Sequence, residues 1–323
     1  MIFFILVLSG FFLLLSSGYC LVKLIVNFSL ISKISLTFLS SVVIAIGTSF
    51  PELVVTTFSV LYREDGIALG NVFGSNVFNT LVILGCCLLI HPIFIRKEDI
   101  LNILNYFFII IYFWIWLLLF PLERVFGAIS FIVFIIFLYK NYLRSLNNSF
   151  LFKNRSNFQL KNLKQQNLFL EIFKIIFCLI FLLIGANYIV ISIQKLVLLL
   201  GFSSLFVSSL IVGIGTSLPE LTTCLIAAIN QQDEIILGTV IGSNIFNILG
   251  VLGISSLVSN HPLNLHPDVF SYYLPMLICS LLGFIIFGNM GKYFSKLGGI
   301  FLLIIYVFFF IFLTLREKIF ISL

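Results

Sequence analysis

The chain has 323 residues, of which 61% are hydrophobic and only 9% are charged, and its formal net charge at pH 7 is +6. A mean hydropathy of +1.22 is too high for a soluble domain, which could not bury so much apolar surface. The composition therefore excludes soluble proteins and indicates a polytopic membrane protein. The positive charge does not indicate nucleic-acid binding, because its excess lies mainly in one segment, residues 140–168.

Apolar runs long enough to cross a bilayer, about 20 residues each, predict ten membrane-spanning helices and an all-α fold. In chain order the predicted spans are residues 2–26, 35–62, 66–90, 100–120, 122–143, 169–195, 202–229, 235–258, 268–289 and 297–315. The first span lacks a basic segment before it and a small-residue cleavage site. It is therefore interpreted as a helix and not as a signal peptide.

The segment between the fifth and sixth spans is polar and basic. It contains six basic residues and no acid, namely Lys140, Arg144, Lys153, Arg155, Lys161 and Lys164. We interpret residues 144–168 as a connector between a first unit, 1–143, and a second unit, 169–323. Because basic loops stay on the cytoplasmic side, the connector is predicted to be cytoplasmic, which with ten helices puts both termini outside.

Cysteine and histidine show no metal-ligand pattern. The six cysteines lie singly or as one adjacent pair in apolar runs, where they act as small apolar residues. His91 and His261 each precede a proline at a predicted helix end, where a capping or loop role is favoured over metal ligation. We therefore expect no cofactor.

The two units are copies of one another. Residues 41–90 and 209–258 align without a gap at an offset of 168, with 22 of 50 positions identical, including glycine, threonine, proline, glutamate and asparagine. Each copy carries five predicted spans, and because five is odd the second copy enters the membrane in the opposite orientation. The sequence thus predicts two inverted-topology five-helix repeats. Such repeats are typical of secondary transporters, whose substrate sites lie near the bilayer midplane.

The first motif of each copy is GTSFPE (47–52) or GTSLPE (215–220). Proline removes a backbone donor and disfavours helix at the residue before it, so each span is predicted to break at Thr48–Pro51 or Thr216–Pro219, freeing carbonyl oxygens. The threonine and the glutamate of each motif are four residues apart and can point into one cavity. Carbonyl, hydroxyl and carboxylate oxygens suit Ca²⁺ and Na⁺ better than transition metals.

The second motif opens the third and eighth spans as GNVFGSNVFN (70–79) and GTVIGSNIFN (238–247). Its glycines are four residues apart, which lets another helix approach closely. A serine and an asparagine four residues apart form a polar stripe in each copy: Ser75 with Asn79, and Ser243 with Asn247. For Asn76 and Asn244, a role in joining helices and a role as ion ligands remain equally open.

Acidic residues single out the centre of the predicted site. Of the twelve in the chain, only Glu52 and Glu220 lie in the middle of predicted spans, and no Lys, Arg or His lies at matching depth. A carboxylate at that depth costs several kcal/mol, so a function is expected for it. Together the two glutamates carry a charge of −2, which one divalent cation balances.

With both motifs in both repeats, the chain resembles the calcium/cation antiporter superfamily and, within it, the prokaryotic sodium/calcium exchangers. The resemblance implies a ten-helix membrane protein, in a prokaryotic inner (plasma) membrane, that exchanges Na⁺ for Ca²⁺ by alternating access. It implies a calcium site at Glu52, Glu220, Thr48 and Thr216. The implied sodium sites add Ser49, Ser75, Ser217 and Ser243, with carbonyls of Ala45 and Gly213. Many exchangers carry an Asp at one of the two positions occupied here by Asn79 and Asn247.

Several alternatives remain. An H⁺/Ca²⁺ antiporter would bind protons on the same glutamates, and a cation channel would line a pore with them. An intramembrane protease is disfavoured, because the chain has no His-Glu-x-x-His motif and no Asp deep in a span. We expect a transporter and not an enzyme, acting as a monomeric unit. Its partners are the lipid bilayer and Ca²⁺ and Na⁺ ions, and none is a nucleic acid.

Overall fold

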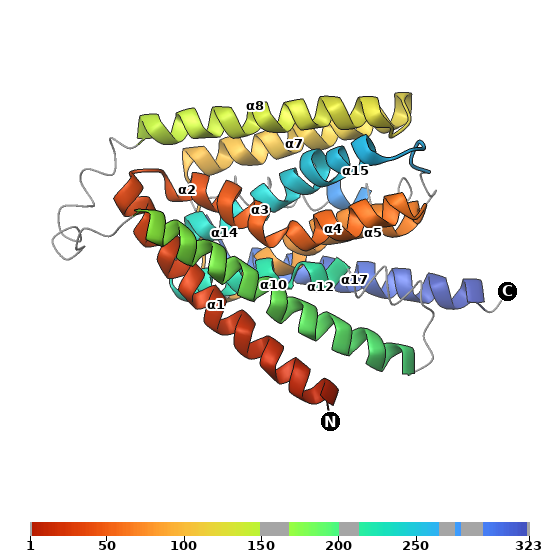
Figure 1. Cartoon of the computed structure of the whole chain (residues 1–323), viewed down its shortest axis with the longest axis horizontal. Coiled ribbons are helices and arrows are strands. Elements are labelled where there is room, and N and C mark those ends of the chain that lie inside the picture. The colour runs from red at the N-terminus through yellow and green to blue at the C-terminus, as the bar shows by residue number, and fades with distance from the viewer. Residues whose placement is uncertain (1, 149–167, 200–212, 265–274, 279–292, 322–323) are drawn as a thin grey trace.

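The computed structural model describes residues 2–148, 168–199, 213–264, 275–278 and 293–321 (Figure 1). These residues are almost entirely helical. The α-helices are α1 (Ile2–Ser32), α2 (Leu36–Leu39), α3 (Ala45–Thr48), α4 (Phe50–Leu61), α5 (Asp65–Phe78), α6 (Leu84–Ile90), α7 (Lys97–Leu119), α8 (Arg124–Asn148), α10 (Leu168–Leu199), α12 (Gly213–Thr216), α13 (Leu218–Ile229), α14 (Asp233–Ile245), α15 (Leu252–Val258) and α17 (Lys296–Ile321). Three π-helical segments, η1 (Ser40–Ile44), η2 (Asn79–Ile83) and η5 (Phe246–Val251), continue these helices, and strands β1 (Ile93–Phe94) and β2 (Tyr293–Phe294) pair antiparallel.

Helices long and apolar enough to cross a membrane confirm an integral membrane protein. Six occur in the described part of the chain, and a bent pair, Leu36–Thr48 with Phe50–Leu61, would make a seventh span. Two shorter apolar helices, Leu218–Ile229 and Lys296–Phe312, cover parts of two further predicted spans. The predicted span 268–289 lies almost wholly outside the described residues, and so does the first part of 202–229.

The first helix is longer than predicted. It continues to Ser32 and not only to residue 26, because the chain first leaves helical geometry at Lys33, whose φ is 59°. A positive φ is unfavourable for a residue with a side chain, so this position marks a true end of the helix. α8 and α17 also continue past their predicted ends, to Asn148 and Ile321 in place of residues 143 and 315, whereas the separation of α7 from α8 near residue 121 agrees with the prediction.

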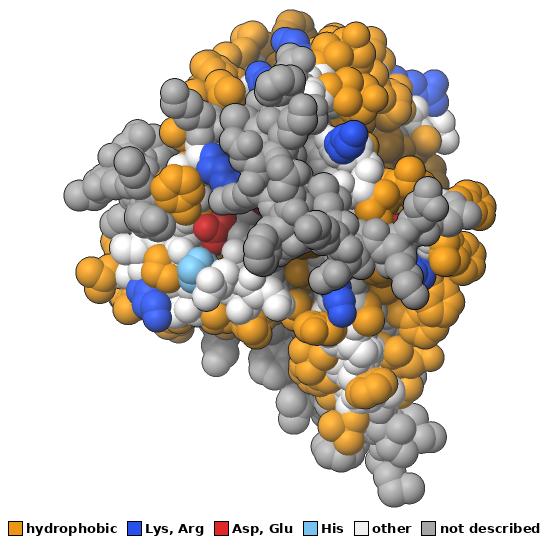
Figure 2. Space-filling view, turned by 90° about the vertical axis from the view of Figure 1, so that its left-hand side faces the viewer, with side chains coloured by type: hydrophobic (Ala, Val, Ile, Leu, Met, Phe, Trp, Pro, Cys, Tyr) orange, Lys and Arg blue, Asp and Glu red, His pale blue; other side chains and the backbone are white. Residues whose placement is uncertain are grey.

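Helices are arranged around two buried central spans. The span Asp233–Val258 is buried over its whole apolar window and Asp65–Ile90 over 72% of it, against 28–39% for the spans of α1, α7, α8 and α10. α1 packs along α10, and both cross the remaining helices diagonally in Figure 1. Hydrophobic side chains cover much of the outside, as the end view in Figure 2 shows. That outer apolar surface is what a lipid bilayer requires.

Glycine allows η1 and α14 to pack in close contact. A side-chain carbon added at Gly242 would lie 2.7 Å from the Cα atom of Ser41, and one added at Gly238 would lie 2.8 Å from the Cβ atom of Ser40. Real carbon atoms do not approach so closely, so only glycine fits at these two positions. The predicted small-residue spacing is therefore confirmed at this helix crossing.

Two acidic residues join the repeats reciprocally at their helix ends. Asp65 starts α5 and lies 3.0 Å from Nε2 of His261, which follows α15. Asp233 occupies the same place at the start of α14, and it lies 3.4 Å from Nε2 of His91, which follows α6. Both histidines thus have the helix-end role predicted for them. The two contacts fix the central spans of one repeat against those of the other.

Candidate functional site

Each glutamate motif contains a helix break. α3 ends at Thr48, α4 begins at Phe50, and the two parts of the span are bent by 46°. The second copy breaks in the same way at Ser217. Both breaks lie within the predicted ranges, Thr48–Pro51 and Thr216–Pro219, although Phe50 and Leu218, the residues before the prolines, are already the first residues of α4 and α13. Proline follows in the first turn, where its missing N–H costs no hydrogen bond within the helix that begins there.

The break places each glutamate in the first turn of a half-helix. Glu52 lies at the start of α4 and Glu220 at the start of α13, and both side chains are fully buried. The first turn of a helix carries a partial positive charge from its unpaired N–H groups, which favours a carboxylate there. The local sequence thus makes two expensive buried charges tolerable without using a Lys or Arg.

The two motifs exchange hydrogen bonds. Ser49 Oγ donates to Glu220 Oε1 over 2.6 Å, and Ser217 Oγ donates to Glu52 Oε1 over 3.1 Å. Ser243 Oγ also donates to Glu220 Oε1, over 3.4 Å. Each glutamate is therefore held by a serine of the other repeat, and the two carboxylates belong to one site.

The remaining residues of the first motif surround this centre. Thr48 is buried and donates its hydroxyl hydrogen to the carbonyl oxygen of Ile44, 2.9 Å away. The carbonyl of Ala45 accepts the backbone N–H of Ser49 over 3.0 Å, so it is not fully freed by the break. Pro51 has no N–H, and so the carbonyl of Gly47 four residues earlier loses its helical donor.

Second-repeat residues are arranged differently around the same centre. The Thr216 hydroxyl has two acceptors within reach of its one hydrogen, the carbonyl of Gly213 at 3.3 Å and an amide oxygen of the first repeat at 3.2 Å. Ser75, from the first repeat, donates to that same Gly213 carbonyl over 3.4 Å. Hydrogen bonds between the repeats thus connect six of the residues named from the sequence in three groups: Ser49 with Glu220, Ser217 with Glu52, and Ser75 with Gly213. Within the second repeat, Ser243 also bonds to Glu220 and Thr216 to Gly213, whereas Thr48 donates to carbonyls of its own span, including that of Ala45. Asn79 and Asn247 bond to asparagines of the opposite repeat.

Four asparagines connect the two repeats through hydrogen bonds. Asn79 Nδ2 donates to Asn244 Oδ1 over 3.1 Å, and Asn247 Nδ2 donates to Asn76 Oδ1 over 3.0 Å. Asn76 and Asn244 therefore accept bonds across the repeat interface, which favours the helix-joining role left open for them. The NH₂ groups of Asn79 and Asn247 donate these hydrogen bonds, which defines the orientation of both amides. The amide oxygens of both residues then have no donor among the described residues.

Four of the buried side-chain oxygens that have no hydrogen-bond partner among the described residues belong to the two motifs: Glu52 Oε2, Glu220 Oε2, Asn79 Oδ1 and Asn247 Oδ1. All four residues are fully buried. A buried acceptor without a donor is costly, and a buried carboxylate oxygen is more so. The four form two pairs, each with members 168 residues apart, so corresponding atoms of the two repeats are left without a hydrogen-bond donor.

π-Helical turns occur at Asn79 and at Asn247, the corresponding positions of the two repeats. η2 begins at Asn79, and η5 includes Asn247 as its second residue. π-Helical turns are rare and occur mostly at functional sites, because the wider turn displaces side chains and loosens carbonyls from their usual donors. The sequence contains no proline or glycine pair that would predict these turns at both positions.

One residue of the site was missed from the sequence. Asn71 is buried, its Nδ2 donates to the Glu52 carbonyl over 3.3 Å and to Thr56 Oγ1 over 3.0 Å, and its Oδ1 accepts the Thr216 hydroxyl over 3.2 Å. It thus joins the two glutamate motifs. The signal lay in the second motif, where GNV in one copy corresponds to GTV in the other, with Thr239 in place of the asparagine.

The polar atoms at this centre are hard oxygen atoms, and the centre carries negative charge. Its ligand atoms are carboxylate, amide, hydroxyl and carbonyl oxygens, with a formal charge of −2, and no ion pair among the described residues includes either glutamate. Oxygen ligands without nitrogen or sulfur are typical of sites for Ca²⁺ and other hard cations.

Comparison with known proteins identifies relatives over nearly the whole length. The profile of a family described as "Sodium/calcium exchanger protein" matches residues 2–143 and 171–315. An uncharacterised membrane protein of Methanocaldococcus jannaschii is 33% identical over 69% of this chain and 71% of its own length. The sodium/calcium exchanger MaX1 of Methanosarcina acetivorans is 28% identical over 82% of this chain and 85% of its own.

Solved structures show the same fold. The sodium-calcium exchanger NCX_Mj, in crystals soaked with Na⁺ and Sr²⁺, superposes with a TM-score of 0.81 and 27% sequence identity. The superposition covers 95% of this chain and 97% of NCX_Mj. A form of NCX_Mj soaked without Na⁺ or Ca²⁺ gives a TM-score of 0.80 at 26% identity.

Proposed function

Because this chain belongs to the sodium/calcium exchanger family, we propose that it is a secondary active antiporter that exchanges Na⁺ for Ca²⁺ across the membrane by alternating access. The observation that carries the proposal is the set of four fully buried oxygens without donors, two from carboxylates and two from amides. A transported cation would satisfy all four. Two carboxylates and one Ca²⁺ make a neutral complex, and so do two carboxylates and two Na⁺.

The proposed calcium ligands are Glu52 and Glu220, with the hydroxyl or carbonyl oxygens of Thr48 and Thr216. Thr216 supports this assignment, since its hydroxyl hydrogen is directed to Asn71 and Gly213 and its lone pairs remain for a cation. The proposed sodium ligands come from the serines that hydrogen-bond across the repeats, Ser49, Ser217, Ser75 and Ser243, with the carbonyls of Ala45 and Gly213. Asn79 and Asn247 complete the set through their free amide oxygens.

Exchange, as opposed to leakage, follows from the charge of the site. When no cation is bound, the site has a charge of −2. The conformational change would then hold two uncompensated carboxylates in a region of low dielectric, and the electrostatic cost of that step is high. When Ca²⁺ or Na⁺ is bound, the net charge is close to zero and the cost falls. The conformational change therefore proceeds mainly with ions bound, which couples the movement of one ion to that of the other.

We propose the full architecture of ten helices in two inverted five-helix repeats, residues 1–143 and 169–323, joined by a cytoplasmic connector at 144–168. Matching lengths of α4 and α13, and of α6 and α15, support the duplication. The reciprocal Asp–His contacts support a two-fold relation between the copies. In this arrangement both termini lie outside, the protein resides in a prokaryotic inner membrane, and one chain forms a complete transport unit.

Uptake of ⁴⁵Ca²⁺ into Na⁺-loaded proteoliposomes tests the function. An outward Na⁺ gradient should drive uptake that is lost when Na⁺ is equal on both sides. Uptake driven only by an outward H⁺ gradient would assign the protein to H⁺/Ca²⁺ exchange. Single-channel current steps in a planar bilayer would instead show a channel and contradict the proposal.

Asn71→Ala should raise the KM for Ca²⁺ about tenfold and leave the maximal rate nearly unchanged. The variant removes hydrogen bonds worth about 1 kcal/mol each and frees the Thr216 hydroxyl to rotate its hydrogen towards the site. Initial rates of Na⁺-driven uptake at several Ca²⁺ concentrations measure the effect. Thr239→Ala at the repeat-equivalent position is the matched control and should keep the wild-type KM. An equal rise in both variants would show that Asn71 has no special part in holding the site.

Topology is tested with a single reporter cysteine. Ser156 lies outside the described residues, in the basic connector, and Ser156→Cys is expected to be inaccessible from outside the cell. An impermeant maleimide should label it in inverted membrane vesicles and leave it unlabelled in intact cells, since basic loops are retained in the cytoplasm. Labelling in intact cells would reverse the orientation of the whole chain.

A further inference from the structure

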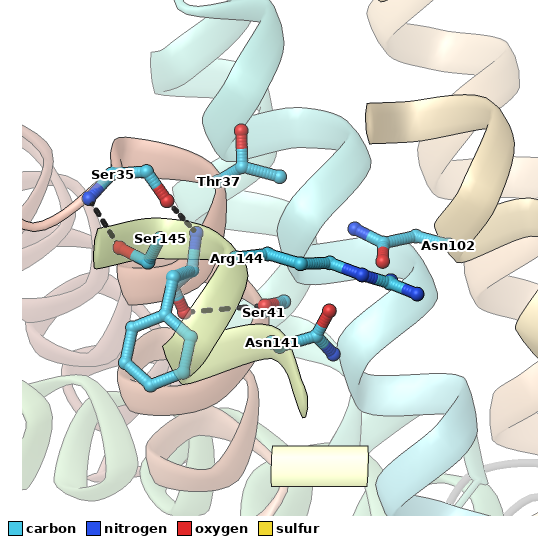
Figure 3. Close-up of a pocket in the computed structure, with 8 residues that line it drawn as sticks. Ser35, Thr37, Ser41, Asn102, Asn141, Arg144 and Ser145 are labelled. Carbon is cyan, nitrogen blue, oxygen red and sulfur yellow. Dashed lines mark hydrogen bonds between the residues drawn. The ribbon is translucent and has the colours of Figure 1, made fainter. Parts of the chain in front are cut away.

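A polar cavity lies apart from the two glutamate motifs. It is a space of about 20 Å³ between the first turns of α2 and η1, the start of α7 and the last turns of α8 (Figure 3). That volume admits about one water-sized group, such as a single oxygen atom of a larger ligand whose remainder stays at the mouth. None of the residues that line the cavity belongs to the glutamate motifs.

The hydroxyl groups on one wall already have partners. Ser35 donates its backbone N–H to Ser145 Oγ over 2.7 Å, and its own Oγ accepts the N–H of Phe38 over 3.2 Å. Ser41 Oγ donates to the carbonyl of Phe38 over 3.2 Å. These bonds hold the end of α8 against the start of α2. They hold one wall of the cavity in place and do not involve the side chains of Asn102, Asn141 and Arg144 on the other wall.

The other wall carries hydrogen-bond donors that lack acceptors. Asn141 is only 7% exposed, and its Nδ2 is fully enclosed. This Nδ2 has no hydrogen-bond partner among the described residues. Arg144, one turn further along α8, is half-buried and has no carboxylate partner in the described chain. In Figure 3 its guanidinium group lies between the side chains of Asn102 and Asn141.

Among the described residues, no carboxylate forms an ion pair with Arg144. The described residues that line the cavity include no acidic side chain. The acid closest to Asn102 along α7 is Asp99, and its carboxylate accepts the backbone N–H of Arg96 over 2.8 Å. A buried NH₂ group beside an unpaired guanidinium is costly unless an acceptor enters, and the strongest acceptor for such a pair is an anion.

We propose that this cavity is a binding site for a phosphate-bearing anion. One phosphate oxygen enters the cavity and accepts the enclosed N–H of Asn141, while Arg144 binds the phosphate through two parallel N–H groups. Asn102 donates from the opposite side. Two sources supply this chemistry, the headgroup of an anionic lipid and free inorganic phosphate.

The surroundings favour a lipid as the source. Next to Arg144 on α8, Leu143 and Leu146 are 41% and 43% exposed, and Tyr139 one turn earlier is 62% exposed. Such side chains contact acyl chains and the membrane interface, so a phosphate held by Arg144 would be at headgroup level. A lone arginine that extends to the bilayer surface also meets lipid phosphates, but it does so through charge alone and needs no buried amide.

Thermal unfolding of the purified full chain in a neutral detergent tests the proposal. The Tm is measured against added phosphatidylglycerol, phosphatidylcholine or inorganic phosphate. Phosphatidylglycerol should raise the Tm of the wild type to a plateau at lower concentration than phosphatidylcholine does. Arg144→Gln should weaken the apparent affinity about tenfold or more, because it removes charge-assisted hydrogen bonds.

Three further variants separate a built site from surface charge. Asn141→Ala keeps the charge and should weaken the affinity several-fold, and so should Arg144→Lys, which keeps the charge but loses the planar fork. Lys140→Gln is the matched control, since it removes one exposed positive charge from the same end of α8 and should bind as the wild type does. Saturation by inorganic phosphate at equal affinity would support the site and assign it to a free anion.

Two results would overturn the proposal. Arg144→Lys and Asn141→Ala binding phosphatidylglycerol as tightly as the wild type would show that charge alone attracts the lipid. Equal losses in Lys140→Gln and Arg144→Gln would show the same. If Arg144→Gln does not yield folded protein, the Asn141→Ala measurement decides the question, because that variant leaves every charge in place.

Discussion

Glutamine in place of either Glu52 or Glu220 is expected to abolish Ca²⁺ transport. Each substitution preserves the shape of the side chain and removes half of the charge of the site, leaving a divalent cation with one uncompensated positive charge in a buried environment. Breaking a buried charge pair costs about 3–5 kcal/mol, which corresponds to a loss of affinity of about 100-fold or more. Na⁺-driven ⁴⁵Ca²⁺ uptake into proteoliposomes measures the loss.

A matched control separates this effect from a general loss of buried charge. Glu171 is also buried, but it pairs with Lys174 at 2.7 Å on the same helix, far along the chain from either motif. Glu171→Gln should therefore retain most of the transport activity. Equal yields of monodisperse protein for all three variants would confirm that folding is unaffected. Near wild-type uptake by either Glu52→Gln or Glu220→Gln would contradict the shared calcium site.

Asn247→Asp is expected to change the ratio of ions exchanged. With two carboxylates the site is neutral with one Ca²⁺ or two Na⁺, and a third Na⁺ would leave a net positive charge that only carbonyl and amide dipoles could offset. Formal charge therefore favours two Na⁺ per Ca²⁺ in the wild type, and such exchange moves no net charge. A third carboxylate accommodates a third Na⁺ or a proton, so uptake by the variant should become sensitive to membrane potential or to pH.

The measurement is Na⁺-driven Ca²⁺ uptake at several imposed membrane potentials and several pH values. Asn79→Asp, the repeat-equivalent variant, should behave in the same way, because its free Oδ1 is related to that of Asn247 by the repeat. Asn230→Asp adds the same charge at an exposed position and should leave both profiles unchanged. Superimposable profiles for the wild type and Asn247→Asp would show that Asn247 only joins helices.

The two repeats differ in the residues that support the glutamate motifs, a difference that the Asn71→Ala and Thr239→Ala variants test. The Glu52 carbonyl and the Thr216 hydroxyl are joined by Asn71, whereas Thr239 and Cys224 stand at the equivalents of Asn71 and Thr56. The two halves of the site therefore have the same ligand atoms but different supports. Such a difference allows the two carboxylates to respond unequally to Ca²⁺ and Na⁺ even though the motifs that contain them are nearly identical.

Much of the site was predictable from the sequence. Its signals are either single residues in an unusual place or a constant spacing between two copies of a motif. A glutamate in the middle of an apolar run is costly wherever the helix packs, so Glu52 and Glu220 stood out before any packing was known. The offset of 168 between the motifs linked them to one another. The helix break near Pro51 was also predictable, since proline acts through its own backbone, although the exact position at Ser49 depended on where the new helix could start.

The sequence by itself thus determined the membrane class, the duplication and the two carboxylates, whereas the tertiary structure decided which atoms meet. Asn76 and Asn79 differ by three positions on one helix, and nothing local shows that the first joins helices while the second keeps a free oxygen. Which oxygen accepts a hydrogen bond depends on partners that lie 171 residues from Asn76 and 165 residues from Asn79 in the sequence. It also depends on the π-helical turn that begins at Asn79. The same holds for Arg144, which belongs by sequence to a basic connector and by packing to a cavity. Hydrogen-bond partners across a bundle depend on the rotation of each helix about its axis, and that rotation is set only when all the helices pack together.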